Sequence, residues 1–139
     1  MRIPGVFATL WRRGHDATAR GASYCDRRDG QDKPIASAED ASNVAILVCN
    51  REAEPVHVVI GGLGRTGCQL PDLGVFVHPE GLVLDYRMGP AWGPQQVATL
   101  FDLFLTIAEA EPALKVHHEY CREAFDVAWK KYREARRTI

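Results

Sequence analysis

The sequence predicts an α+β fold in which an antiparallel sheet of four or more strands is covered by two C-terminal helices. Two observations lead to this prediction. Four short apolar stretches separated by turn residues have the pattern of β-strands. Two longer segments with apolar residues at helical spacing follow them. The length of 139 residues suits one domain with its own core, so residues 1–139 are expected to form a single domain.

The clearest strands form a hairpin. Gly74–His78 and Leu82–Arg87 are rich in Val, Leu, Phe and Tyr, which favour pleated structure. Pro79 and Gly81, which lie between them, have the backbone preferences of a tight turn. Side chains alternate along the second strand, so that one face is apolar and the other is mixed. This pattern is typical of an antiparallel strand that has one face on a core and the other near water.

Two further strands are predicted before the hairpin. Residues 43–50 and 56–60 are continuous apolar runs, and the polar residues 50–55 between them indicate a turn. These two runs are therefore expected to pair antiparallel and to bring the sheet to at least four strands. Residues 3–11 fit either a strand or a short helix. Residues 12–42 have the character of a loop with one short helix, although so long a loop is unusual in a compact domain.

Two helices are predicted after the hairpin. The first begins at Pro94, whose missing N–H is harmless at the first helical position, and ends near Ala110. Its polar residues recur at helical spacing and form one narrow stripe: Gln95, Thr99, Asp102, Thr106 and Glu109. The apolar arc that remains is wide, which indicates a largely buried helix. The second helix, from about Pro112 to Arg136, is amphipathic and is expected at the surface.

The charge is small overall but unevenly distributed. The formal net charge of −1 argues against a dedicated nucleic-acid binder, which usually carries a basic excess. Residues 66–111 hold six acidic residues and one arginine, a net charge of −5. Residues 1–33 and 112–139 each hold seven basic and four acidic residues, a net charge of +3. An acidic central region can steer a basic partner, although a solvated face with no binding role remains an alternative.

The cysteines and the N-terminal residues indicate in which cellular compartment the protein is expected. Cys25, Cys49, Cys68 and Cys121 are scattered and form no CxxC pair, which favours reduced thiols. Residues 1–11 are too short and too interrupted for a signal peptide, and no apolar run reaches membrane-spanning length. We therefore expect a cytoplasmic protein without membrane contact.

Two motifs suggest a bound cofactor or metal, but the residues around each motif do not fit such a site. Residues 62–67 match GxGxxG after a strand, but a dinucleotide site needs a helix directly afterwards, and Pro71 follows instead. His117 and Cys121 have the spacing of two metal ligands on a helix, but no second pair accompanies them. No cofactor, no metal and no catalytic residue is therefore predicted.

A small enzyme remains the main alternative. It would act around the glycine-rich loop 61–67 and use Arg65 and His57. A nucleophile set of Cys68, His57 and Asp85 can also be assembled, but so short a chain with four cysteines and five histidines permits many such sets.

The region 74–110, about a quarter of the chain, resembles a pattern found in small immunity proteins of bacterial polymorphic toxin systems. The resemblance consists of the hairpin end Leu84-Asp85-Tyr86-Arg87, the bend Gly89-Pro90-Ala91-Trp92 and the apolar helix after it. In such systems the toxin is delivered by a contact-dependent or a type VI secretion system. The resemblance implies a non-enzymatic protein that binds a cognate toxin protein in the cytoplasm and neutralises it by covering its active site.

Four residues are expected to bind that partner: Glu80, Asp85, Arg87 and Trp92. Asp85 and Arg87 share the mixed face of the predicted hairpin, and Trp and Arg are frequent hot spots of interfaces. The alternative for Trp92 is a structural role beneath the helix. A homodimer formed through the sheet edge or the last helix is also left open.

Overall fold

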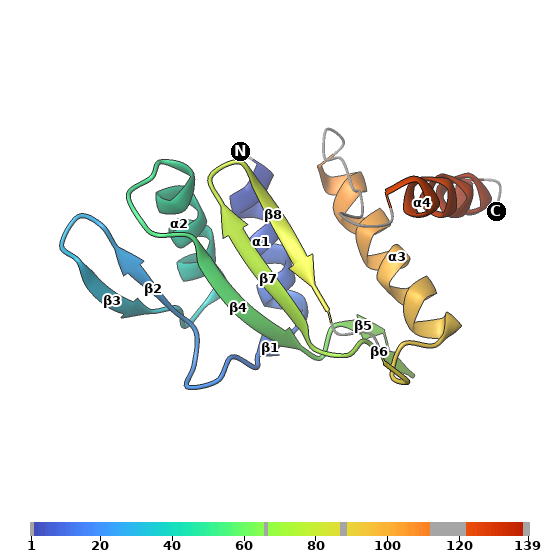
Figure 1. Cartoon of the computed structure of the whole chain (residues 1–139), viewed down its shortest axis with the longest axis horizontal. Helices are drawn as coiled ribbons and strands as arrows, with labels where there is room; N and C mark the ends of the chain where they lie inside the picture. Colours follow the sequence, from blue (N-terminus) through green and yellow to red (C-terminus); the bar gives the residue numbers. More distant parts are fainter. Residues whose placement is uncertain (1, 66, 87–88, 112–121, 138–139) are drawn as a thin grey trace.

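The computed structural model describes residues 2–65, 67–86, 89–111 and 122–137 (Figure 1). Within these ranges the helices are α1 (Arg2–Arg13), α2 (Ala38–Cys49), α3 (Pro94–Ala110) and α4 (Arg122–Arg137). The main sheet contains β1 (His15–Asp16), β4 (Val56–Gly61), β7 (Leu73–His78) and β8 (Gly81–Asp85). Two small hairpins consist of β2 (Ser23–Asp26) with β3 (Gln31–Pro34) and of β5 (Gly64–Arg65) with β6 (Cys68–Gln69).

The main sheet has the strand order β1-β4-β7-β8, and every neighbouring pair is antiparallel. The predicted hairpin is present as β7–β8, and the predicted strand 56–60 is present as β4. The α+β class, the four-stranded antiparallel sheet and the two C-terminal helices are thereby confirmed.

One face of the sheet carries the core. The side chains that β4 and β7 direct to this face are buried: Val56, Val58, Ile60, Leu73, Val75 and Val77. Helices α1 and α2 pack against each other and against this face, while α3 lies beside β8 (Figure 1). Leu100, Leu103 and Ile107 of α3 belong to the same core. The sheet is therefore covered chiefly by α1 and α2, whereas the prediction assigned this cover to the two C-terminal helices.

The prediction of a strand at residues 43–50 is wrong, because these residues form most of α2. The Ser37 side chain caps the helix by accepting a hydrogen bond from the backbone N–H of Asp40 at 3.1 Å. The helix packs against both α1 and the sheet, so it is apolar on more than one side. A short apolar run of this kind has no periodicity that separates a buried helix from a buried strand. The expected pairing of 43–50 with 56–60 is absent, and β4 pairs with β1 and β7 instead.

Residues 2–42 contain more structure than the sequence indicated. Residues 2–13 form α1, and the segment predicted as loop contains β1 and the β2–β3 hairpin. The carboxylate of Asp26 is fully buried in this hairpin and lies 2.8 Å from both Arg28 Nη2 and Lys33 Nζ. Hydrogen bonds from Arg28 and then Lys33 hold the pKa of Asp26 well below its usual range. A buried carboxylate with two partly exposed cations thus links the two strands of a hairpin that has few apolar residues of its own.

Helix α3 begins and ends at the predicted residues, but its polar stripe does not face water throughout. Thr99 is 2% exposed and donates a hydrogen bond to Cys68 Sγ at 3.2 Å, because the β5–β6 hairpin packs on this side of the helix. Asp102 accepts a hydrogen bond from the Tyr132 hydroxyl of α4. The stripe therefore joins α3 to its neighbours.

The predicted second helix is described from Arg122 to Arg137, as α4. It packs on α3 through aromatic rings, with Phe125, Trp129 and Tyr132 each within 6 Å of the Phe101 ring centroid. Residues 112–121, and with them His117 and Cys121, lie outside the described residues. Of the described helices, none has the length and apolar character that crossing a membrane requires.

Candidate binding face of the sheet

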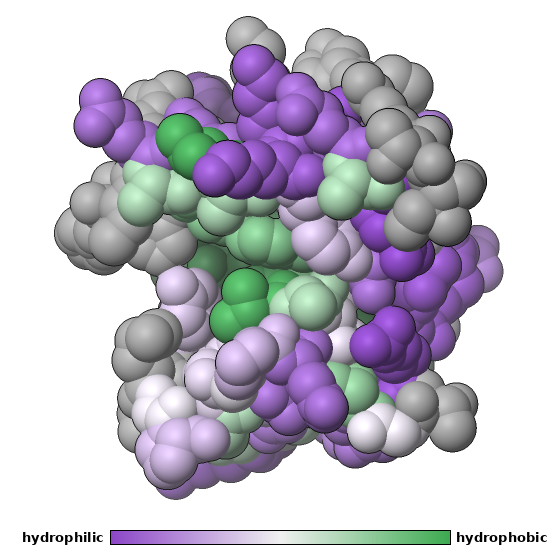
Figure 2. Space-filling model, turned by 90° about the vertical axis from the view of Figure 1, so that its right-hand side faces the viewer, coloured by the Kyte–Doolittle hydropathy of each residue, from purple (hydrophilic) through white to green (hydrophobic). Residues whose placement is uncertain are grey.

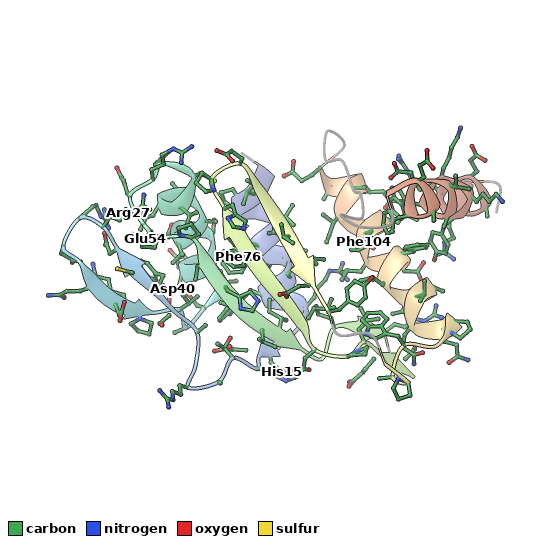
Figure 3. All side chains as sticks on the ribbon, in the orientation of Figure 1. His15, Arg27, Asp40, Glu54, Phe76 and Phe104 are labelled. Atoms are coloured by element: carbon green, nitrogen blue, oxygen red, sulfur yellow. The ribbon has the colours of Figure 1, made fainter. Side chains whose placement is uncertain are left out.

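The second face of the main sheet points away from the core. Strand alternation places five side chains there that together define what we call the open face: His57, Phe76, His78, Val83 and Asp85. Figures 1 and 3 view this face from the front, with α1 and α2 behind the sheet. None of the five is buried, and Val83 is 45% exposed. The sheet is therefore one-sided, with its core on one face and a solvent-accessible surface on the other.

An aromatic band crosses the open face. The β4–β7 register places His57 opposite Phe76, and their ring centroids lie 5.4 Å apart. The rings of Phe76 and His78 are stacked at 4.2 Å, with an angle of 1° between their planes. Val83 lies opposite Phe76 on the next strand. Aromatic and apolar groups from three adjacent strands thus form one continuous band.

An imidazole–carboxylate pair lies beside this band. His57 Nε2 is 3.2 Å from Asp85 Oδ2, although β7 separates the strands that carry the two residues. The pair spans that strand over Gly74, which lies opposite Asp85. A Cβ atom at this position would overlap Asp85 Oδ1 and lie 2.6 Å from His57 Nε2. Glycine at position 74 therefore makes room for the contact between His57 and Asp85.

A similar arrangement occurs at the end of β4. His15 lies opposite Gly61, and a Cβ atom at Gly61 would lie 2.9 Å from His15 Nε2 and 2.7 Å from Asp72 Oδ1. Within the part of the chain that the structure describes, all three histidines (His15, His57 and His78) thus belong to this side of the sheet. Opposite-charge and polar cross-strand pairs of this kind also stabilise sheets without any binding role.

The structure separates the residues that the sequence grouped as partner-binding. Asp85 lies on the open face, and Glu80 projects from the adjacent turn, where its carboxylate is 3.1 Å from Arg51 Nη2. Trp92 lies elsewhere: its ring is 5.2 Å from that of Tyr86, and it packs against the core. A structural role beneath the helix was the alternative that the sequence left open for Trp92. Arg87 lies outside the described residues, and the binding roles of all four remain predictions.

The residues of the alternative enzyme site make separate contacts. His57 pairs with Asp85, whereas Arg65 Nη1 lies 3.5 Å from Asp102 Oδ2 on α3. Cys68 is buried against α3, where it accepts the hydrogen bond from Thr99. Among the described residues, no group of three or more His, Cys, Asp or Glu side chains is arranged to hold a metal ion.

Phe76, His78 and Gly74 were not identified as site residues from the sequence. Their alternation within residues 74–78 does predict that they point away from the core. The missing information was the strand order, because only the neighbouring position of β4 and β7 brings His57 to Phe76 and to Asp85.

Comparisons of the chain with protein-family models, with curated proteins and with solved structures give no match. What the open face binds therefore has to be inferred from its residues and geometry.

Proposed function

We propose that this chain is a non-enzymatic immunity protein of a bacterial polymorphic toxin system. In the cytoplasm of the producing cell, it binds its cognate toxin through the open face and covers the toxin's active site. The observation that carries the proposal is the open face itself, where partly buried aromatic rings and the exposed Val83 adjoin carboxylates on a sheet whose core lies on the opposite side. The resemblance of residues 74–110 to such immunity proteins supplies the kind of partner.

The apolar part of the open face supports binding to a protein. Phe76 and His78 stack on each other, and Val83 exposes nearly half of its surface. Exposed apolar groups that lie together and are bordered by polar ones are typical of interaction sites. The side chains stand on hydrogen-bonded strands, so little conformational entropy is lost when a partner binds.

The charges near the open face support a basic partner surface. Asp72 and Asp85 point to this side of the sheet, and Glu80 extends from the turn. A basic side chain, Arg51, lies next to Glu80 at the turn that ends the sheet. Carboxylates arranged in this way accelerate association with a basic surface, and the effect weakens as salt screens it.

The test is to search the neighbouring genes for a toxin, and then to measure binding of that toxin and protection of cells that express it. Phe76→Ala is expected to weaken binding by roughly 10- to 100-fold, the range of an interface hot spot. Asp85→Lys is expected to slow association, most strongly at low salt. Matched controls are Ile46→Ala on α2 and Asp32→Lys on β3, which change an exposed apolar and an exposed acidic residue away from the open face.

Both control variants should bind like the parent protein. Circular dichroism must show that every variant is folded. If folded Phe76→Ala and Asp85→Lys proteins bind the toxin with the parent's affinity and association rate, the open face is not the interface.

The enzyme alternative makes a different prediction. A small enzyme that uses Arg65 would lose function in an Arg65→Ala variant, even where toxin binding is unchanged. The proposed inhibitor should protect cells equally well with or without Arg65, because this side chain pairs with Asp102 on another part of the molecule.

A further inference from the structure

The two edges of the main sheet differ in how much further pairing they make. Beyond β4, the sheet continues into β1, and the β2–β3 hairpin adds a bridge between Asp26 and Ala53. The backbone N–H of Glu54 also donates to the carbonyl of Cys25 at 3.0 Å. At the other edge, β8 is the last strand, and within the described residues it pairs with β7 alone. An unpaired edge of this kind is a template for another strand.

The core is incomplete next to β8. Val58 and Val75, which face the core from β4 and β7, are fully buried. Leu82 and Leu84 face the same side from β8 but are only partly buried. Burial therefore decreases at the last strand, although its side chains are as apolar as those of its neighbours.

Helix α3 extends the helical layer beyond this edge. It lies past β8 in Figure 1 and packs mainly on the β5–β6 hairpin. The side chain of Glu111, the residue after α3, approaches α1, since a Cβ atom at Gly5 would lie 3.4 Å from Glu111 Oε1.

Figure 2 shows an apolar hollow on the side of the molecule that carries α3 and α4, with hydrophilic residues around it. The half-buried apolar residues of β8, α3 and the segments next to them are Leu82, Leu84, Tyr86, Trp92 and Phe104. The Nε1 atom of Trp92 is buried, and no acceptor for its N–H is found among the described residues. Buried donors are rarely left unpaired, so this N–H marks a position where an acceptor is missing.

We propose that the β8 edge accepts an extended segment of a protein partner as a fifth strand. Alternate apolar side chains of that segment would cover Leu82 and Leu84, and one of its carbonyl groups would accept from Trp92 Nε1. Asp85 is the only charged residue of β8. Opposite charges pair favourably across strands, so the residue of the segment that faces Asp85 is basic.

A second copy of this chain fits the edge less well than a partner's segment. Pairing β8 with β8 of another copy would bring a second α3 close to the first, because α3 lies on the β8 side of the sheet. An extended segment brings no helix of its own. This inference concerns a surface other than the aromatic band, and it does not require the partner to be a toxin.

The test uses two short synthetic peptides, one in which valine alternates with lysine and one in which valine alternates with glutamate. Binding is followed by NMR of the isotope-labelled protein. The valine–lysine peptide is expected to bind at least about tenfold more tightly. It should shift the backbone amide signals of residues 81–85 and the indole N–H signal of Trp92.

Two charge reversals sharpen the test. Asp85→Lys is expected to reverse the preference, so that the valine–glutamate peptide binds more tightly. Asp72→Lys, the matched control on the same side of the sheet but away from β8, should leave the preference unchanged. Phe76→Ala, which tests the proposed toxin interface, should not weaken peptide binding, so the two proposals can fail separately.

The inference is overturned if neither peptide binds at millimolar concentration, or if both bind equally well. It is also overturned if the shifts are confined to β4 and β7 and leave the Trp92 indole unchanged. Sedimentation of the protein alone gives a further check. A stable dimer whose β8 amides are protected from hydrogen exchange would mean that a second copy already fills the edge.

Discussion

The two faces of the main sheet are built from the same strands and differ in what they contact. On β4 and β7, Val58 and Val75 point into the core and are fully buried. Their neighbours in the sequence, His57 and Phe76, point the other way and remain accessible. Because side chains alternate along a strand, a change of one position along the chain moves a residue from a role in stability to a role at the surface.

Because of this difference, one face of the sheet contributes mainly to stability and the other is free to contribute to binding. The covered face contributes by removing apolar area from water, at roughly 25 cal/mol per Å², so its residues tolerate little change. The open face does not hold the helices in place, which allows it to carry histidines, carboxylates and an aromatic band. Substitutions on the open face should therefore alter binding without unfolding the protein.

The largest expected effect is the loss of a core aromatic ring. Phe7 of α1 is fully buried in the core, so Phe7→Ala should lower the free energy of unfolding by about 3–5 kcal/mol. Phe76→Ala removes the same side chain from the open face and should cost about 1 kcal/mol or less, since the ring is partly solvated. Urea denaturation measures both. Similar costs for the two substitutions would show that the open face is covered in solution.

The next effect concerns the hairpin that closes the β1–β4 edge. The pKa of Asp26 lies well below its usual range because Arg28 and Lys33 donate to its carboxylate. A depressed pKa contributes stability above the unfolded value of about 4 and loses it as the pH falls further. Asp26→Asn should therefore lower stability at neutral pH, and the difference from the parent should shrink below about pH 4.

Urea denaturation at a series of pH values measures this effect. Asp85→Asn is the matched control, because this carboxylate is exposed on the open face. It should change stability little at any pH. A difference between the Asp26→Asn variant and its parent that stays constant down to strongly acidic pH would exclude a buried ionised carboxylate.

A smaller effect is expected where α4 meets α3. Burial and the Asp102 carboxylate raise the pKa of Tyr132 to about 12. A raised pKa contributes stability below the unfolded value of about 10 and loses it as the pH rises through the folded value. Tyr132→Phe should lower the free energy of unfolding by about 1 kcal/mol at pH 7, because one hydrogen bond to a carboxylate is lost.

The difference between Tyr132→Phe and the parent should disappear between about pH 10 and pH 12. Ultraviolet titration of the phenol, with unfolding measured in parallel, tests this. A Tyr132 that ionises with the exposed tyrosines would contradict the contact with Asp102.

The smallest expected effect on stability is at the centre of the open face. Gly74→Ala should displace the Asp85 carboxylate, since the new methyl group would occupy its place. The ring-proton shifts of His57 should then match those in Asp85→Asn, because both changes break the same contact. If His57 signals in Gly74→Ala stay at the parent's positions, Gly74 is not required for the pair.

Several elements could be predicted because their signals are local. Pro79 and Gly81 specify a turn, and the apolar residues on either side specify strands, so the β7–β8 hairpin was predictable. Helix α3 was predictable from Pro94 and from a regular polar spacing. In the same way, alternation within β8 separated Asp85 from the core-facing leucines before any tertiary contact was known.

Other elements had no local signal. The apolar run at residues 43–50 fits a buried strand as well as a buried helix, and its packing against α1 and the sheet decided for a helix. The β2–β3 hairpin encloses the carboxylate of Asp26, which looks like an ordinary surface residue in the sequence. Thr99 fits an exposed polar stripe until the β5–β6 hairpin packs over it.

By itself, the sequence determined which residues of each strand face the same way, because the two-residue period is a property of the extended backbone. Only the tertiary structure decided which strands are neighbours. The choice of neighbours depends on burying apolar side chains that are distant in the sequence, such as Phe7, Val48 and Ile107. This choice places His57 beside Phe76 and Asp85, and it leaves β8 at the edge of the sheet.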